Sequence, residues 1–330
     1  MAVHNPDVVI IGAGMSGLIC AQVLQHAGLN VAIFEKSRGV GGRMATRRTD
    51  TEILTDHGAQ YFTVTEPAFQ TVFDHWLKSG IVDQWRAPIV ELKHGEVVAD
   101  KSDATRYVGV PTMNAVCRSL ADELTIHLGS QISGLEQVAD SWVLYDDHEK
   151  AVARSETVIC TAPAPQTAAL LNSIPSIAVP ARDVEMEACW TLVLILNVGM
   201  NLPYGGAFIN DSELAWIACN SSKPGRQRSP EVWVLHASAE WSRQHLDESP
   251  DTIERELLTV FQRETGHWPA AISRSWTHRW RYAKPTNPLK TRCLFDEQLR
   301  IGACGDWCGG PRVEGAFQSG LALANKIVNS

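Results

Sequence analysis

The sequence predicts an α/β protein of two domains, one built around a parallel sheet and the other an α+β domain built on a mixed sheet. Three observations lead to this prediction. A buried-strand pattern precedes a glycine-rich loop at each end of the chain, a helical pattern follows each loop, and the middle of the chain is mostly strand-like. The length of 330 residues also suits two domains better than one core.

The bulk composition is that of an ordinary globular protein, with 45% hydrophobic and 20% charged residues. The net charge of -8 argues against nonspecific nucleic-acid binding, which needs a basic surface. No apolar stretch reaches the length of about 18 residues that a membrane span needs. The eight cysteines show neither a CxxC pair nor zinc spacing, so we expect no metal site and a reduced, cytoplasmic protein.

The first glycine loop has the order GxGxxG and lies between a β-branched strand at residues 8–11 and a helical pattern at residues 16–25. The three glycines of such a loop make the tight turn, let the backbone approach a pyrophosphate, and let helix and strand pack closely. A second strand at residues 30–34 ends in an acidic residue, where a ribose hydroxyl is held. This order predicts a bound dinucleotide, with contacts from Gly12, Ala13, Gly14, Met15, Ser16, Gly17, Glu35 and Lys36.

A second glycine loop directly after Glu35 indicates that the dinucleotide is FAD rather than NAD. The run "KSRGVGGRMATRR" adds a cation, Arg43, that can reach the far side of the pyrophosphate. This run resembles the RxGGR motif of FAD enzymes in the amine-oxidase branch of the glutathione-reductase superfamily, and "LTDHGAQYFTVT" extends the resemblance. The resemblance implies a glutathione-reductase-type FAD-binding Rossmann domain, noncovalent FAD, and contacts from Arg43, Met44, His57, Gly58, Ala59, Gln60 and Tyr61. We expect His57 to contribute mainly its backbone.

The last glycine loop explains why both ends of the chain carry such a motif. A short strand at residues 299–303 leads into Gly305-Asp306, which resembles the second FAD fingerprint, where the aspartate binds the flavin-side sugar alcohol. A closing helix at residues 313–328 keeps a small face that we expect to approach the cofactor, with Val313 and Ala316 near its positive end. In the resembling oxidases, the strand near Ile132 contacts the adenine. The two ends then meet because FAD is long.

Each domain is expected to be assembled from distant pieces of chain. We assign residues 1–65, 100–165 and 295–330 to the FAD-binding domain, and residues 66–99 and 166–294 to the substrate domain. Helices are predicted at residues 67–78, 110–124 and 250–266. The run "SSKPGRQRSP" at residues 221–230 has the composition of an exposed loop.

One strand of the second domain carries alternating rings on one face, namely Trp276, His278, Trp280 and Tyr282. Such a face is either a core seam or a platform for a flat ligand. We expect at least Trp280 to reach the flavin cavity. His236 ends an apolar strand, where a lone histidine is either a hydrogen-bonded core residue or a site residue. Tyr61 lies in the run that passes the flavin.

The whole chain resembles the renalases, through "VVIIGAGMSGL", "DHGAQYF", "WVLH", "HRWRYAKP" and "GDWCGGPRVEGAFQSG". The resemblance implies an oxidase of NAD(P)H isomers that carry the hydride at the wrong ring carbon. Such an oxidase would take 2-dihydro forms first and 6-dihydro forms as a further substrate, yield NAD(P)+, and pass electrons to molecular oxygen, which forms hydrogen peroxide. It places Tyr61, His236 and Trp280 in the substrate cavity. We expect a monomer or weak dimer, and amine oxidation or a redox sensor without turnover remain alternatives.

Overall fold

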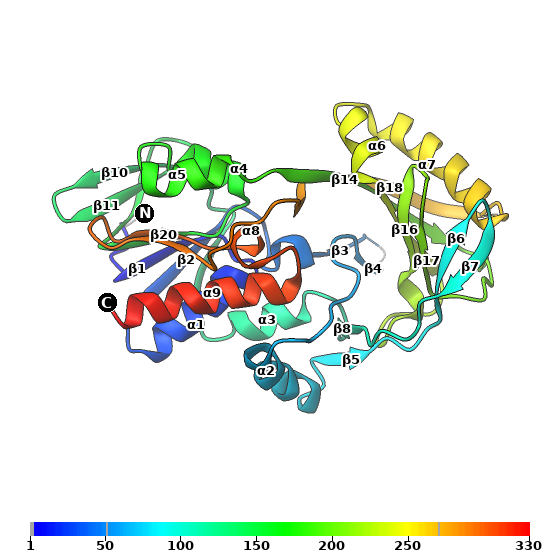
Figure 1. Ribbon diagram of the computed structural model, residues 1–330, viewed down its shortest axis with the longest axis horizontal. Coiled ribbons are helices and arrows are strands. Elements are labelled where there is room, and N and C mark those ends of the chain that lie inside the picture. The colour runs from blue at the N-terminus through cyan, green and yellow to red at the C-terminus, as the bar shows by residue number, and fades with distance from the viewer. Residues whose placement is uncertain (1–2, 51, 270) are drawn as a thin grey trace.

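The computed structural model describes residues 3–50, 52–269 and 271–330. The chain forms two lobes, and both termini lie in the lobe that contains the parallel sheet (Figure 1). The long strands β14 (Met186–Leu196) and β18 (Ile272–Pro285) run from one lobe toward the other (Figure 1). No helix within the described ranges is long and apolar enough to cross a membrane.

The first lobe is built around a six-stranded sheet in the order β19-β20-β13-β1-β2-β9. Its strands are β1 (Val8–Ile11), β2 (Val31–Glu35), β9 (Thr125–Leu128), β13 (Thr157–Cys160), β19 (Leu294–Asp296) and β20 (Ile301–Ala303). All neighbours are parallel except β19 and β20. Glycine loops follow β1 and β20. Both strands run parallel to β13, so the two loops lie at the same end of these strands.

Two layers cover this sheet, as the predicted Rossmann-type domain requires. One face packs against α1 (Met15–His26), α3 (Ala115–Ala121) and α9 (Val313–Val328). The other face packs against α4 (Ala164–Leu170), α5 (Pro175–Arg182) and an antiparallel sheet of β10 (Ile132–Val138), β11 (Ser141–Asp146) and β12 (Ala151–Ser155). Figure 1 shows these layers above and below the sheet.

The second lobe is built on a seven-stranded mixed sheet in the order β18-β14-β17-β16-β15-β6-β7. Its remaining strands are β6 (Ile89–Lys93), β7 (Glu96–Asp100), β15 (Gly206–Ile209), β16 (Leu214–Cys219) and β17 (Glu231–Ala237). Helices α6 (Ala239–Gln244) and α7 (Pro250–Thr265) cover its outer face through a cluster that contains Trp233, Leu257 and Phe261. The opposite face is turned toward the first lobe.

The remaining elements are short. They are η1 (Gly42–Met44), β3 (Thr46–Arg48), β4 (Leu54–Asp56), α2 (Pro67–Lys78), β5 (Val82–Gln84), β8 (Tyr107–Gly109), η2 (Asn220–Ser222) and α8 (Asp306–Gly309). β3 pairs with β4, and β5 pairs with β8.

Two packing contacts bear on the expected domain boundaries, which stay a prediction. Residues of α4 and α5, and Val184 after them, share one core with Val158 and Ile301. Helix α2 packs against Phe317 of α9 rather than on the mixed sheet, through Phe69. The helix expected at residues 110–124 is shorter, because residues 110–114 form a loop that turns the backbone N–H of Met113 toward Asp56.

Candidate active site

The first glycine loop is closed on one side and open on the other. Gly12 has φ +108°, and a Cβ there would lie 2.5 Å from Thr161 Oγ1. A Cβ on Gly17 would lie 2.1 Å from the carbonyl oxygen of Gly12. These contacts press the start of α1 against β1 and the end of β13, as the spacing predicted.

The open side fits a pyrophosphate. A Cβ at Gly14 would meet no atom within 4 Å. Helix α1 begins there with no side-chain cap and no acidic residue in its first turn, so its first N–H groups are free to bind an anion. The loop thus has the shape and the donors that the diphosphate of FAD requires.

Glu35 ties the first loop to the second. Its carboxylate is buried and accepts hydrogen bonds from the backbone N–H groups of Ala13 and Ser37, each at 2.8 Å. This places Glu35 at the end of β2 beside the first loop, where a ribose contact was predicted. Lys36 is exposed.

Arg43 and Asp306 bring the two ends of the chain together. The guanidinium of Arg43 binds both carboxylate oxygens of Asp306, with N–O distances of 2.6 and 2.7 Å, and donates to the carbonyl of Ala283 at 3.0 Å. The Asp306 side chain is 9% exposed. The second glycine loop therefore contacts the last motif through a bidentate ion pair, a contact that was not predicted.

We expect Asp306→Ala to lower the FAD content of the purified protein. The change removes a carboxylate acceptor from the cofactor site and leaves Arg43 with only the carbonyl of Ala283. Flavin content per chain is measured from the absorbance ratio of flavin to protein. An unchanged flavin content would remove Asp306 from the cofactor site.

The small face of α9 approaches α1, which differs from the expected approach to the cofactor. A Cβ on Gly320 would lie 2.2 Å from the carbonyl oxygen of Ser16, and the Ser16 hydroxyl donates to the carbonyl of Ala316 at 2.6 Å. Close packing of the two helices fixes the N-terminus of α9 near the cofactor loops. Its Glu314 accepts hydrogen bonds from the backbone N–H groups of Thr65 and Glu66.

The carbonyl oxygen of His57 receives contacts from three strands of the mixed sheet. Trp280 Nε1 donates to it at 3.2 Å, the Thr191 hydroxyl at 3.3 Å, and His236 Nε2 lies at 3.2 Å. The His57 ring stacks on Trp280 with a centroid distance of 5.2 Å and lies edge-on to Trp276 and to His278. The predicted site residues His57, His236 and Trp280 thus form one cluster, and His57 uses its backbone there.

Both imidazoles of this cluster are neutral at neutral pH. Burial, helped by the neighbouring His278, lowers the pKa of His57 to about 4. Burial also lowers the pKa of His236 to about 4, although its hydrogen bond with the backbone of His57 acts to raise that pKa. In the described part of the chain, His57 Nδ1 is buried without a hydrogen-bond partner.

The side chains that face the first lobe form a row across the mixed sheet, which we call the site-facing row. Register pairs connect its members from strand to strand: His278, Thr191, His236, Trp216 and Phe208. Tyr61 contacts the row at Trp216, with a centroid distance of 5.6 Å. The register between β14 and β18 shifts beyond Trp280. Trp276, His278 and Trp280 make ring contacts, whereas Tyr282 makes none with the described residues.

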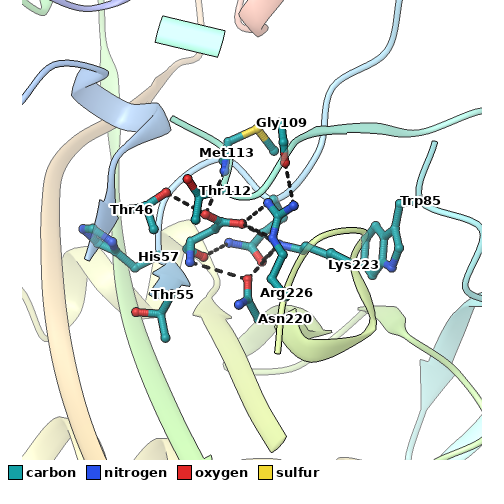
Figure 2. Close-up of polar contacts among 12 residues, drawn as sticks. Thr46, Thr55, His57, Trp85, Gly109, Thr112, Met113, Asn220, Lys223 and Arg226 are labelled. Carbon is teal, nitrogen blue, oxygen red and sulfur yellow. Dashed lines mark hydrogen bonds and ion pairs between the residues drawn. The ribbon is translucent and has the colours of Figure 1, made fainter. Parts of the chain in front are cut away.

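A buried charged cluster under the "DHGAQ" run was missed by sequence reasoning (Figure 2). Asp56 Oδ2 pairs with the guanidinium of Arg226 and lies 3.8 Å from Lys223 Nζ, and these three side chains are at most 2% exposed. Lys223 also donates to Gln60 Oε1 at 3.0 Å, and Gln60 Nε2 donates to the carbonyl of Gly58 at 2.9 Å. The cluster therefore holds the backbone that passes the candidate flavin site.

Lys223 and Arg226 lie in the run expected to be an exposed loop, and that expectation was wrong for both side chains. The polar composition of the run hides their burial, because their carboxylate partner is Asp56, 170 positions from Arg226. Burial would raise the pKa of Asp56, but the charges of Arg226 and Lys223 outweigh it and hold that pKa below its usual value. The pKa of Lys223 is also lowered, to about 7, because burial outweighs the attraction of Asp56.

We expect Lys223→Met to flatten the pH dependence of stability above pH 7. An unfolded lysine keeps its proton up to a pKa of about 10.4, whereas folded Lys223 loses it near pH 7. The unfolded state then binds more protons between these values, so the free energy of unfolding of the wild type rises with pH by on the order of 2 kcal/mol from pH 7 to pH 9. Urea unfolding across this range should show the rise in the wild type and in Lys93→Met, an exposed control, and equal slopes in all three proteins would contradict the assignment.

The remaining predicted cofactor residues lie around the two loops. Met15 and Met44 are buried in the first core, Ala59 donates its N–H to the carbonyl of Arg43 at 2.9 Å, and Ile132 begins β10. Val313 is the first residue of α9. Their contacts with FAD stay predictions. No cluster of three potential metal ligands occurs within the described ranges.

Comparisons with known proteins agree with this geometry. A model of the NAD(P)-binding Rossmann-like domain matches residues 10–76. Renalase of Mus musculus is 22% identical over 306 residues, which cover 86% of this chain and 87% of that protein. The flavin-containing amine oxidase A of Sus scrofa is 42% identical over 63 residues, which cover 19% of this chain and 12% of that protein. Cyclohexylamine oxidase from Brevibacterium oxydans IH-35A has a similar structure, with a TM-score of 0.76, 12% identity and coverage of 98% of this chain and 99% of that chain.

These similarities confirm the predicted α/β fold, the resemblance to renalases and FAD as the cofactor. The activity shared at this level is that of an FAD-dependent oxidoreductase. The chain is similar to renalase of Mus musculus over most of its length and shares the fold of cyclohexylamine oxidase.

Proposed function

We propose that the chain oxidises NAD(P)H isomers that carry the hydride at the wrong ring carbon, chiefly the 2-dihydro form, to NAD(P)+. The observation that carries the proposal is the site-facing row, which combines aromatic rings with the neutral imidazole of His236, beside the neutral ring of His57. From His278 to Phe208 this row contains no carboxylate, and the next register position, Glu91 on β6, is paired with Lys101. A flat, uncharged dihydronicotinamide ring can stack on such a surface, which offers no carboxylate to pair with an ammonium group.

FAD held at the glycine loops would supply the acceptor for the hydride of the dihydronicotinamide ring, and with one proton from solvent the two electrons would reduce molecular oxygen to hydrogen peroxide. The protein positions the donor and excludes water. Trp280 supplies a flat surface beside His57, and Thr191 and His236 fix the carbonyl of His57. Loss of the hydride restores the aromatic pyridinium ring directly, so the reaction needs no general base. Tyr61, His236 and Trp280 are accordingly proposed as positioning residues of the substrate cavity.

We expect Trp280→Ala to slow flavin reduction by at least tenfold while FAD stays bound, because the stacking surface and the hydrogen bond to His57 are both lost. Trp280→Phe keeps a ring and should retain much of the rate. Stopped-flow absorbance at the flavin band measures both variants. Normal reduction kinetics in Trp280→Ala would return Trp280 to a packing role.

Amine oxidation is the second candidate, favoured by the local identity with the flavin-containing amine oxidase A of Sus scrofa. The two functions differ in their products. Under air, an isomer mixture from borohydride-reduced NAD+ should yield NAD+ and hydrogen peroxide in equal amounts. Peroxide formation with amines, and none with the isomers, would favour the amine oxidase.

The eight cysteines are all free thiols, which suits the reducing cytoplasm that we propose as the compartment. A monomer or weak dimer remains our proposal for the assembly. Sedimentation at working concentration would test it.

A further inference from the structure

A buried arginine without an acidic partner lies beside the far end of the site-facing row. Arg106 is 5% exposed, and its guanidinium makes no ion pair with any residue that the structure describes. Arginine is almost never buried without a paired charge. An unpaired buried cation beside a candidate substrate cavity therefore indicates a missing anion.

The guanidinium of Arg106 is only partly satisfied. Nη1 donates to the carbonyls of Lys101 and Ala104, at 2.7 and 2.9 Å. Nε is buried and has no partner within the described chain. Nη2 makes no hydrogen bond to a described residue and is not among the fully buried atoms, so it is open to a ligand.

Two other donors surround the same place. The guanidinium carbon of Arg106 lies 5.2 Å from the ring centroid of Tyr61 and 5.9 Å from that of Phe208. Trp216 contacts the same two rings, at 5.6 and 4.7 Å, and its buried Nε1 has no partner in the described ranges. The Tyr61 hydroxyl likewise forms no hydrogen bond with the described part of the protein and is not fully buried.

These unsatisfied groups select the chemistry of the ligand. A planar guanidinium and a hydroxyl suit an anion with several acceptor oxygens, such as a phosphate. In the site-facing row, Phe208 lies two strands away from His236, which is roughly 10 Å at the usual strand spacing. The donors thus lie beyond the part of the row proposed to hold the nicotinamide ring.

We propose that Arg106 and Tyr61 form an anion-binding subsite that holds the diphosphate of the dinucleotide substrate. This inference rests on the proposed function. NAD and NADP share the diphosphate, so the subsite holds both kinds of isomer without distinguishing them.

The test compares three hydride donors with the FAD-loaded protein under anaerobic conditions. They are the borohydride-generated isomers of NAD, of nicotinamide mononucleotide and of nicotinamide riboside, which carry a diphosphate, a monophosphate and no phosphate. In Arg106→Gln, we expect the donor concentration for half-maximal flavin reduction to rise about tenfold or more for NAD isomers. It should change less than twofold for riboside isomers, with the limiting rate kept throughout.

Control variants separate ligand binding from a structural role. Arg106→Lys keeps the charge and should recover part of the affinity, and Tyr61→Phe should weaken the NAD isomers selectively. Arg86→Gln removes an exposed charge from the connection after β5 and should behave as the wild type. An equal change for all three donors in Arg106→Gln, or no change for any, would overturn the proposal.

A binding measurement distinguishes this inference from the proposed function. ADP-ribose carries the diphosphate without a redox ring, and calorimetry should show binding to the wild type that Arg106→Gln weakens about tenfold. If no isomer reduces the flavin, the proposed function fails, and ADP-ribose then decides the subsite. Binding that is equal in the wild type and Arg106→Gln, or absent from both, would contradict it.

Discussion

Replacing Asp56 with asparagine is expected to lower the free energy of unfolding by about 3–5 kcal/mol, because the change leaves the buried charges of Arg226 and Lys223 without their carboxylate. Oδ1 of Asp56 also accepts from the Met113 N–H at 2.9 Å and from the Thr46 hydroxyl at 2.7 Å. An asparagine in either orientation points its NH2 group at one set of these donors. The loss is a large part of the 5–15 kcal/mol of typical domains.

Thermal and urea unfolding of the purified variant measure this loss, and the melting temperature should fall by roughly 10 °C. Asp247→Asn is the matched control, because Asp247 pairs with Arg279 and Arg281 while its side chain is 78% exposed. Surface pairs contribute little, so this control should unfold close to the wild type. Equal stability of Asp56→Asn and Asp247→Asn would show that the buried cluster does not hold the fold.

Gly17→Ala is expected to abolish FAD binding and to destabilise the first lobe. The added Cβ would lie 2.1 Å from the carbonyl oxygen of Gly12, which belongs to the backbone and cannot move aside as a flexible side chain would. Relief of the clash requires α1 to move away from β1. That movement also disturbs the contact between α1 and α9, where a Cβ on Gly320 would lie only 2.2 Å from the carbonyl oxygen of Ser16.

Two further glycines of the loops give this prediction its controls. Gly14→Ala meets no protein atom within 4 Å, so the apoprotein should keep its stability while FAD binding weakens at least tenfold. Gly39→Ala also meets no atom within 4 Å, but Gly39 is exposed and lies outside the predicted cofactor contacts, so both properties should stay unchanged. FAD affinity and apoprotein unfolding are measured for each variant. If Gly14→Ala bound FAD normally, the open side of the loop would not be the cofactor cradle.

Local patterns made much of the first lobe predictable. The order of strand, glycine loop, helix and acidic residue depends on neighbouring residues, and it gave β1, α1 and β2 nearly as the structure has them. The ranges of α2 and α9 were likewise predicted, because a proline or a glycine loop precedes each helix and its apolar residues recur regularly.

Long-range contacts made the rest unpredictable. The segment after residue 165 has no signal that tells whether its helices cover the parallel sheet or the mixed one, and the structure places Ile177 in the core of the first lobe. The charges of Lys223 and Arg226 are typical of an exposed loop, and only folding brings them to Asp56. Arg106 likewise looks like a surface residue until the structure places it over the ring of Tyr61.

The most direct test of the proposed function is the absorbance of the bound flavin under anaerobic conditions. The oxidised protein is mixed in turn with the isomers from borohydride-reduced NAD+, with ordinary NADH and with a panel of amines. We expect rapid bleaching of the flavin by the isomers and little or none by NADH or by any amine. Bleaching by an amine alone would contradict the proposal in favour of amine oxidation, and an unchanged spectrum with every donor would favour a flavin-binding sensor.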